Sequence, residues 1–309
     1  MLVIAAPGQG AQTPGFLAPW LELPGVSERI AQWSEVVRVD LIRLGTTGSA
    51  DEIRDTAVAQ PLLVAAAIAA ADALGVTGQD AGNPARAVAG HSVGELAAGA
   101  IAGVLDPADA LSLVGTRGRA MAQAAAARPT SMTAVLGGDE ATVLASLEAH
   151  GLTPANINGA GQIVAAGTVE QLAAFAADPP AGARLRPLQV AGAFHTVHMA
   201  PAVDALRAAA ASVQVSDPRL TVLSNRDGAA VATGAEWIER IITQVSAPVR
   251  WDECMRTMAA LGATAFIELP PAGTLVGLAR RALPGITTLA VKQPADLQAA
   301  AKLLAEQAA

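Results

Sequence analysis

The amino-acid sequence predicts an α/β protein, with a mostly parallel sheet covered by helices on both faces and a small inserted unit. Three observations lead to this fold class. Short apolar segments that suit buried strands alternate with helical patterns on both sides of the chain's middle. One of these segments leads directly into a glycine-flanked turn and then an alanine-rich helical pattern. In the middle, the order changes to strand, helix, strand, strand, helix, strand, which is the ferredoxin-like βαββαβ unit.

The first part of the chain begins with a short apolar strand and a glycine-rich loop. Helices follow where an Asp or Ser can accept hydrogen bonds from free amides at a helix start, or where proline fits the first turn. The strands expected here are 2–6 and the segment around Val88, and the helices expected are 27–37, 51–56, 61–74, the segment from the turn after Val88 to about 103, and 108–126.

The inserted unit spans about sixty residues. Its expected strands are 131–136, 153–158, 162–166 and 184–190, and its expected helices are 139–150 and 169–177. Arg128-Pro129 and Val190-Ala191-Gly192 mark the points where the chain enters and leaves it. We therefore predict a small ferredoxin-like subdomain over residues 129–192, and a larger, discontinuous α/β subdomain over residues 1–128 and 193–309.

After the insertion, strands and helices alternate again. The strands expected here are 220–223, 265–269 and 286–291, and the helices expected are 201–211, 235–245, 251–261, 273–283 and 296–307. Parallel strands need crossover connections, which such helices supply. These strands are therefore expected to join the first ones in one sheet.

The turn after the Val88 strand carries a candidate nucleophile, Ser92. The sequence Gly90-His91-Ser92-Val93-Gly94 matches Gly-x-Ser-x-Gly, in which a serine stands on a sharp turn between a strand and a helix. Glycine two residues before and after the serine removes the Cβ atoms that would crowd this turn. The first amides of the following helix lack intrahelical partners, so they can stabilise a developing oxyanion.

Composition excludes several classes of function. Of 309 residues, 52% are hydrophobic and 15% are charged, which is typical of a globular protein. The net charge of −7 argues against a nucleic-acid partner. The longest apolar run, residues 62–71, is too short to span a bilayer, so no membrane partner is expected. The N-terminal strand lacks a basic region, which favours a cytoplasmic protein without a signal peptide.

No cofactor or metal site is expected either. The single cysteine, Cys254, excludes an internal disulfide and a multi-cysteine zinc site. In the loop at residues 7–12, Thr13 stands where a dinucleotide-binding motif has its third glycine. A phosphate-loop lysine motif does not occur in the sequence.

A catalytic serine needs a base, and the sequence has four histidines. His91 adjoins the serine on the turn and is expected to shape the site, whereas His150 ends a helix of the inserted unit. His195 and His198 follow the return from the insertion, so one of these two is the better candidate. No acid is evident as a third member, and a backbone or side-chain carbonyl could orient the imidazole instead.

Six motifs together resemble a known family. They are Pro-Gly-Gln-Gly-Ala-Gln (7–12), Gly-His-Ser-Val-Gly-Glu (90–95), Arg-Gly-Arg (117–119), Asn-Gly-Ala-Gly-Gln (158–162), Ala-Phe-His-Thr (193–196) and Pro-Val-Arg-Trp (248–251). The sequence resembles the malonyl-CoA:acyl carrier protein transacylases and the related acyltransferase domains of polyketide synthases. The resemblance covers nearly the whole chain and implies a hydrolase-like α/β subdomain that carries a ferredoxin-like one.

The resemblance also implies roles for individual residues. It makes Ser92 the nucleophile and His195 its general base. The backbone amides of Gln9 and Val93 would form the oxyanion hole.

Three further residues would bind the substrate or orient the base. Arg117 would hold the malonyl carboxylate in a bidentate pair, as guanidinium geometry allows. Asn158 lies in a family motif near the cleft. Gln244 stands where the family offers a main-chain carbonyl to the histidine.

The implied activity is transfer of a malonyl group from malonyl-CoA to the phosphopantetheine thiol of acyl carrier protein, by a ping-pong route through a Ser92 ester. Malonyl-CoA would be a substrate rather than a cofactor. Two other functions stay open on sequence grounds: a serine hydrolase or proofreading thioesterase of the same fold, and a non-catalytic module that binds carrier protein. The fatty-acid and polyketide pathways would need the same site, so the sequence does not separate them.

Overall fold

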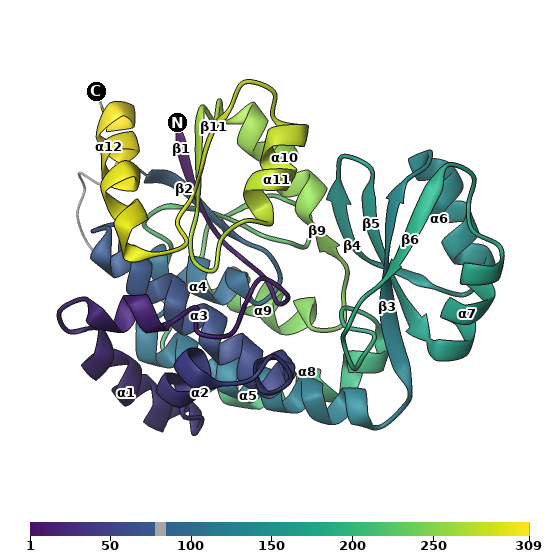
Figure 1. Ribbon diagram of the computed structural model, residues 1–309, viewed down its shortest axis with the longest axis horizontal. Helices are drawn as coiled ribbons and strands as arrows, with labels where there is room; N and C mark the ends of the chain where they lie inside the picture. The colour runs from purple at the N-terminus through teal and green to yellow at the C-terminus, as the bar shows by residue number, and fades with distance from the viewer. Residues whose placement is uncertain (78–84, 309) are drawn as a thin grey trace.

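The computed structural model of the chain describes residues 1–77 and 85–308, and the strands within them form two sheets that lie side by side (Figure 1). The strands are β1 (Leu2–Ala6), β2 (Ala85–Gly90), β3 (Thr130–Gly137), β4 (Thr153–Gly159), β5 (Gln162–Thr168), β6 (Ala183–Pro187), β7 (Thr221–Leu223), β8 (Ala230–Val231), β9 (Val249–Arg250), β10 (Ala265–Glu268) and β11 (Thr287–Ala290). The helices are α1 (Val26–Val37), α2 (Leu41–Thr47), α3 (Thr56–Ala73), α4 (Gly94–Ile101), α5 (Pro107–Ala126), α6 (Glu140–Ala149), α7 (Val169–Ala177), α8 (Ala200–Ala210), α9 (Gly234–Gln244), α10 (Trp251–Ala260), α11 (Leu275–Ala282) and α12 (Leu297–Ala308). Short 3-10 helices are η1 (Ala18–Glu22), η2 (Glu52–Arg54), η3 (Val197–Met199) and η4 (Pro294–Asp296).

The larger sheet confirms the predicted parallel architecture. Its strand order is β11-β10-β1-β2-β7-β8, and every neighbouring pair except β7 and β8 is parallel. Alternate residues of β1 face opposite sides. Leu2 and Ile4 join a core with α3, α4 and α5, whereas Val3 and Ala5 join a second core with α10 and α11. Helices therefore cover both faces, as expected.

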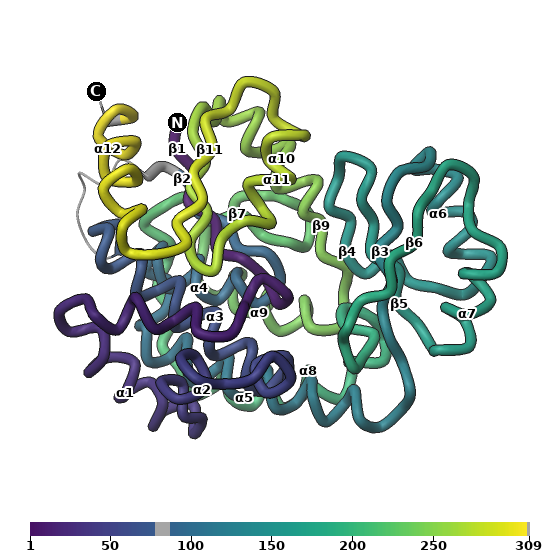
Figure 2. The backbone as a smooth tube through the Cα atoms, in the orientation of Figure 1, coloured from purple at the N-terminus to yellow at the C-terminus, as the bar shows by residue number. Residues whose placement is uncertain are grey.

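The smaller sheet has the order β6-β3-β5-β4-β9. Its first four strands are antiparallel neighbours, and their chain order with α6 and α7 is the predicted βαββαβ order. Figure 2 shows the chain entering this region from the end of α5. Strand β9, from outside residues 129–192, pairs with β4 in parallel. The exact division of the chain into subdomains stays a prediction.

Helix α3 is the central helix of the larger core. It begins at Thr56, five residues before the expected start at Pro61, because the Asp55 side chain accepts a hydrogen bond from the Ala57 amide. The prediction of a helix over residues 51–56 was wrong, because only the short 3-10 helix η2 forms there. By length and hydropathy α3 could cross a membrane, but 78% of it is buried inside the protein, as a core helix is.

Candidate active site

The turn at Ser92 has the geometry that the sequence predicts. Strand β2 ends at Gly90 and α4 begins at Gly94, and Ser92 between them has a φ of 53°, which is uncommon for a residue with a side chain. A Cβ on Gly90 would lie 2.0 Å from the Gly94 carbonyl carbon, and a Cβ on Gly94 would lie 2.3 Å from the Ala6 oxygen. Both positions therefore require glycine.

His195 lies next to this serine. The Ser92 Oγ and the His195 Nε2 are 2.7 Å apart. On the other side of the ring, Nδ1 lies 2.8 Å from the main-chain oxygen of Gln244. Because a carbonyl only accepts, Nδ1 carries the hydrogen and Nε2 is free to accept one from the serine. A carbonyl thus takes the place of a triad acid.

The electrostatics of the site favour a neutral imidazole. His195 is 3% exposed, and burial is the main cause that lowers its pKa from 6.5 to about 3. The nearby positive charge of Arg117 lowers it further in the same direction. At neutral pH the ring is therefore an unprotonated base.

Arg117 is a buried cation with neutral partners. Its side chain is 1% exposed, and its two terminal nitrogens donate to Gln60 Oε1 at 2.7 Å and to Gln244 Oε1 at 2.9 Å. One of these nitrogens also lies 3.4 Å from Ser92 Oγ. Burial lowers the Arg117 pKa to about 10. Within residues 1–77 and 85–308 no carboxylate forms an ion pair with it, although the nearby Glu95 acts to raise its pKa.

A cavity of about 240 Å³ opens onto the serine between the two sheets. Six of the residues predicted to form or shape the site line it: Gln9, His91, Ser92, Val93, Asn158 and His195. Its apolar wall includes Met132, Val164, Leu188 and Leu278. Arg117 and Gln244 lie behind this lining and reach the site through Ser92 and His195. The structure thus brings the seven predicted site residues and His91 to one place.

The backbone amides of Gln9 and Val93 are the predicted oxyanion donors. Both residues line the cavity beside Ser92. Within the described part of the chain, neither amide donates a hydrogen bond to a protein acceptor. The Gln9 side chain is held by the Arg54 carbonyl and the Thr56 hydroxyl, both at 3.3 Å. Among the described residues, both amides are therefore unpaired donors of cavity-lining residues beside Ser92.

Asn158 and the remaining histidines have different surroundings. Asn158 Oδ1 lies 2.9 Å from His91 Nε2, and the His91 ring packs edge-on against Trp251 at 5.6 Å. Burial lowers the pKa of His91. His198 is half-buried in η3 and does not line the cavity. His91 therefore shapes the site through Asn158, and His198 stands apart from it.

Sequence reasoning missed three buried polar residues around the site. Gln60 holds Arg117, as described above. Glu95 is 1% exposed and accepts a hydrogen bond from the Gln244 side chain at 2.5 Å. Asn225 is fully buried and accepts one from the Ser92 amide at 2.7 Å. The available signal for Asn225 was its place just after β7, because sites in parallel sheets form at the carboxyl ends of strands.

Residues 6–299 match the acyl transferase domain family. A malonyl CoA-acyl carrier protein transacylase of Mycobacterium tuberculosis is 54% identical over 307 residues, which cover 98% of this chain and all of the relative. A crystal structure of the enzyme from the same organism superposes with a TM-score of 0.93 at 54% identity, over 97% of this chain and 99% of that one. A malonyl-transacylase solved in complex with its type II polyketide acyl-carrier protein has a TM-score of 0.89 at 29% identity, over 98% of this chain and 99% of that one.

Proposed function

This chain belongs to the acyl transferase domain family, and we propose that it transfers a malonyl group from malonyl-CoA to the phosphopantetheine thiol of acyl carrier protein. One observation carries the proposal: a neutral histidine nitrogen and a buried guanidinium nitrogen lie 2.7 Å and 3.4 Å from the same serine oxygen. A base at the nucleophile serves acyl transfer in general, and a cation beside it selects an acyl group that carries its own carboxylate.

The first half of the reaction forms an ester on Ser92. His195 Nε2 takes the proton of the serine hydroxyl while Oγ attacks the thioester carbonyl carbon of malonyl-CoA. The amides of Gln9 and Val93 donate to the oxyanion of the tetrahedral intermediate. The carbon–sulfur bond then breaks, and the CoA sulfur leaves with the proton from His195. Such proton transfer contributes about 10²- to 10⁴-fold in rate.

The second half reverses these steps with another thiol. His195 takes the proton of the phosphopantetheine thiol of acyl carrier protein, and the sulfur attacks the Ser92 ester. The bond to Oγ breaks, and the proton returns from His195 to the serine. The Gln244 main-chain oxygen orients the imidazole through both halves. No metal or cofactor takes part in this scheme.

Arg117 provides the selectivity. The guanidinium of Arg117 contacts only neutral groups, so it lacks a negatively charged partner. The malonyl carboxylate would supply one by forming a bidentate pair with it. An acetyl group would leave that cation desolvated and unpaired, which is unfavourable. Asn158 would act on the substrate side of the cavity, next to His91. The apolar wall would surround the thioester arm.

Two broader expectations belong to the same proposal. The small ferredoxin-like subdomain over residues 129–192 would form one wall of the cleft, against the catalytic subdomain of residues 1–128 and 193–309. The protein would act in the cytoplasm, and the burial of α3 within the core argues against a membrane span there. Neither a nucleic acid nor a membrane is expected as a partner.

Intact-protein mass spectrometry tests the proposed function directly. After brief exposure to malonyl-CoA, the wild-type chain should gain one malonyl group, and Ser92→Ala should gain none. Addition of holo acyl carrier protein should then move the group to the carrier. An adduct lost equally fast without carrier would instead indicate a hydrolase. No adduct with any acyl-CoA would indicate a non-catalytic carrier-binding module.

A further inference from the structure

Asn225 bridges the two sides of the turn that holds Ser92. It lies two residues after the end of β7, which pairs with β2 in the larger sheet. Its Oδ1 accepts from the Ser92 amide at 2.7 Å, and its Nδ2 donates to the Gly90 carbonyl at 2.7 Å. One fully buried amide side chain thus satisfies a backbone donor and a backbone acceptor that lie two residues apart.

The turn needs such support because Ser92 has a disfavoured backbone conformation, with a φ of 53°. Its carbonyl is also held, by the Gln244 Nε2 at 3.2 Å. Both backbone polar groups of Ser92 are therefore fixed by amide side chains, Asn225 from the end of β7 and Gln244 from the end of α9. The Val93 amide follows in the same turn, next to the Ser92 carbonyl that Gln244 holds.

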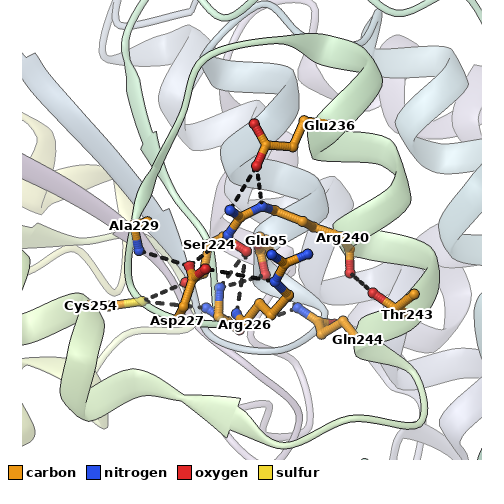
Figure 3. Close-up of polar contacts among 11 residues, drawn as sticks. Glu95, Ser224, Arg226, Asp227, Ala229, Glu236, Arg240, Thr243, Gln244 and Cys254 are labelled. Atoms are coloured by element: carbon orange, nitrogen blue, oxygen red, sulfur yellow. Dashed lines mark hydrogen bonds and ion pairs between the residues drawn. The ribbon is translucent and has the colours of Figure 1, made fainter.

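These two amides share one anchor, the carboxyl group of Glu95. It accepts from the Asn225 backbone amide at 3.2 and 3.3 Å and from the Gln244 side chain at 2.5 Å. Figure 3 shows Glu95 and Gln244 within a polar cluster beside Arg240. Arg240 donates to Asp227 at 2.6 Å and to Glu236 at 2.7 Å, and so fastens the loop after β7 to α9.

We infer that Asn225 is a positioning residue for the proposed acyl transfer. By holding the turn, it keeps Ser92 Oγ within hydrogen-bond distance of His195 and keeps the Val93 amide directed at the oxyanion that forms during the reaction. The inference rests on the proposed function. Asn225 is not among the cavity-lining residues that the structure describes, so it acts through the turn rather than on substrate. A merely structural Asn225 would affect stability and leave the turnover of folded enzyme intact.

The substitution Asn225→Asp tests this with little change in shape. One carboxylate oxygen can still accept from the Ser92 amide, but the other faces the Gly90 carbonyl, where only a donor fits. We expect kcat to fall about 10²-fold, the usual effect of misplaced reacting groups. The loss should be equal for malonyl-CoA and acetyl-CoA, with KM nearly unchanged, because the cavity and Arg117 stay intact.

Acidic pH should partly restore this variant, because a protonated carboxyl can donate to the Gly90 carbonyl. The ionisable groups around the new carboxyl are Glu95 on α4, Cys254 on α10, Arg240 on α9 and Asp227 on the loop after β7. Cys254 Sγ lies 3.8 Å from Asn225 Nδ2. The ratio of variant to wild-type kcat, measured from pH 5 to 8, removes effects common to both proteins. It should rise as the pH falls.

Cys254→Ala is the matched control. Cys254 is buried in the same cluster and donates to the Ser224 carbonyl at 3.4 Å, but it does not contact the turn. We expect it to lower the free energy of unfolding while keeping kcat. If both variants lose kcat in proportion to lost stability, Asn225 is only structural. Asn225→Asp with wild-type kcat at every pH would also overturn the inference.

A fluorophosphonate that labels the serine gives a readout without acyl-CoA. The rate of labelling depends on the nucleophile and on the oxyanion donors. Asn225→Asp should therefore slow labelling about as much as it lowers kcat. Should the wild-type chain be labelled but form no malonyl ester, the proposed function fails, and the labelling rates still test Asn225. If Asn225→Asp does not fold, Asn225→Ser, which removes the same bridge, should show the same slow labelling. Unchanged labelling of the folded variant would contradict the inference.

Discussion

Arg117 differs from most buried arginines in what surrounds it. Its partners are the side-chain oxygens of Gln60 and Gln244, which orient the guanidinium without neutralising it. Its Nε has no hydrogen-bond partner in the described part of the chain. A buried charge held by neutral dipoles is costly, so such a site gains more than usual when a carboxylate arrives.

Arg117→Ala should therefore change selectivity more than it changes general reactivity. Hydrogen bonds to charged groups contribute about 1.5–3 kcal/mol each, so loss of a bidentate pair should lower kcat/KM for malonyl-CoA at least about 10²-fold. Transfer from acetyl-CoA should fall far less. Steady-state kinetics with both donors measures the ratio. Arg119→Ala is the control, because Arg119 lies on the same helix and binds the Val37 carbonyl away from the cavity. Equal losses for both donors would contradict the role of Arg117.

The residues that the sequence's own patterns could identify are those whose role is local, whereas the roles of His195, Arg117 and Gln244 came from the resemblance to a known family. Ser92 and its flanking glycines form one short motif, so their function follows from the turn itself. Glu95 and Asn225 are 130 positions apart and meet only in the folded chain. The sequence does not show which distant residue will form hydrogen bonds with a buried polar side chain. These contacts could therefore not be predicted.

For helices and strands, too, the sequence predicts what local residues determine and misses what contacts with distant segments determine. Most helices and strands were predicted to within a few residues, because capping residues and apolar patterns are local. Helix α2 was not predicted, since Gly45 lies inside it. A Cβ there would lie 2.6 Å from the Leu17 side chain, so this glycine serves a close contact with another segment. Tertiary packing, invisible to local pattern, overrides helix propensity at this position.

Helix α11 provides a stability prediction. Glu268, at the end of β10, accepts hydrogen bonds from the amides of Gly273, Leu275 and Val276 at 2.9 to 3.0 Å. Glu268→Gln replaces one acceptor oxygen by a donor, which leaves an amide unsatisfied and should cost about 2 kcal/mol of unfolding free energy. Urea unfolding measures this cost.

The same substitution on an exposed carboxylate is its control. Glu239 is more than half exposed and pairs with Arg207 on the surface, so Glu239→Gln should change stability little. Because Leu275 and Leu278 of α11 line the cavity, Glu268→Gln should also raise KM for malonyl-CoA. A Glu268 variant as stable as the Glu239 variant would show that the cap is unimportant.

At the scale of the whole molecule, two buried groups at the active site, His195 and Glu95, titrate in opposite senses. Burial lowers the pKa of His195 to about 3 and raises the pKa of Glu95 to about 7. Between pH 3 and 6.5 the unfolded chain binds the proton of His195 and the native chain does not, so this group makes stability rise with pH. Between pH 4.5 and 7 the native chain keeps the proton of Glu95 and the unfolded chain releases it, so this group makes stability fall with pH.

The two effects should nearly cancel in the wild-type chain between pH 4.5 and 6.5, and single substitutions should separate them. Each group contributes up to about 1.4 kcal/mol per pH unit. From pH 6.5 to 5, His195→Gln should therefore gain about 2 kcal/mol relative to wild type, and Glu95→Gln should lose a similar amount relative to wild type. Urea unfolding at both pH values measures these differences. Variants that keep a constant offset from wild type would show that neither group titrates as described. If the unfolding free energies of the two variants instead change with pH in opposite directions, the buried polar groups around the nucleophile also keep the stability of the wild-type protein nearly constant across mildly acidic pH.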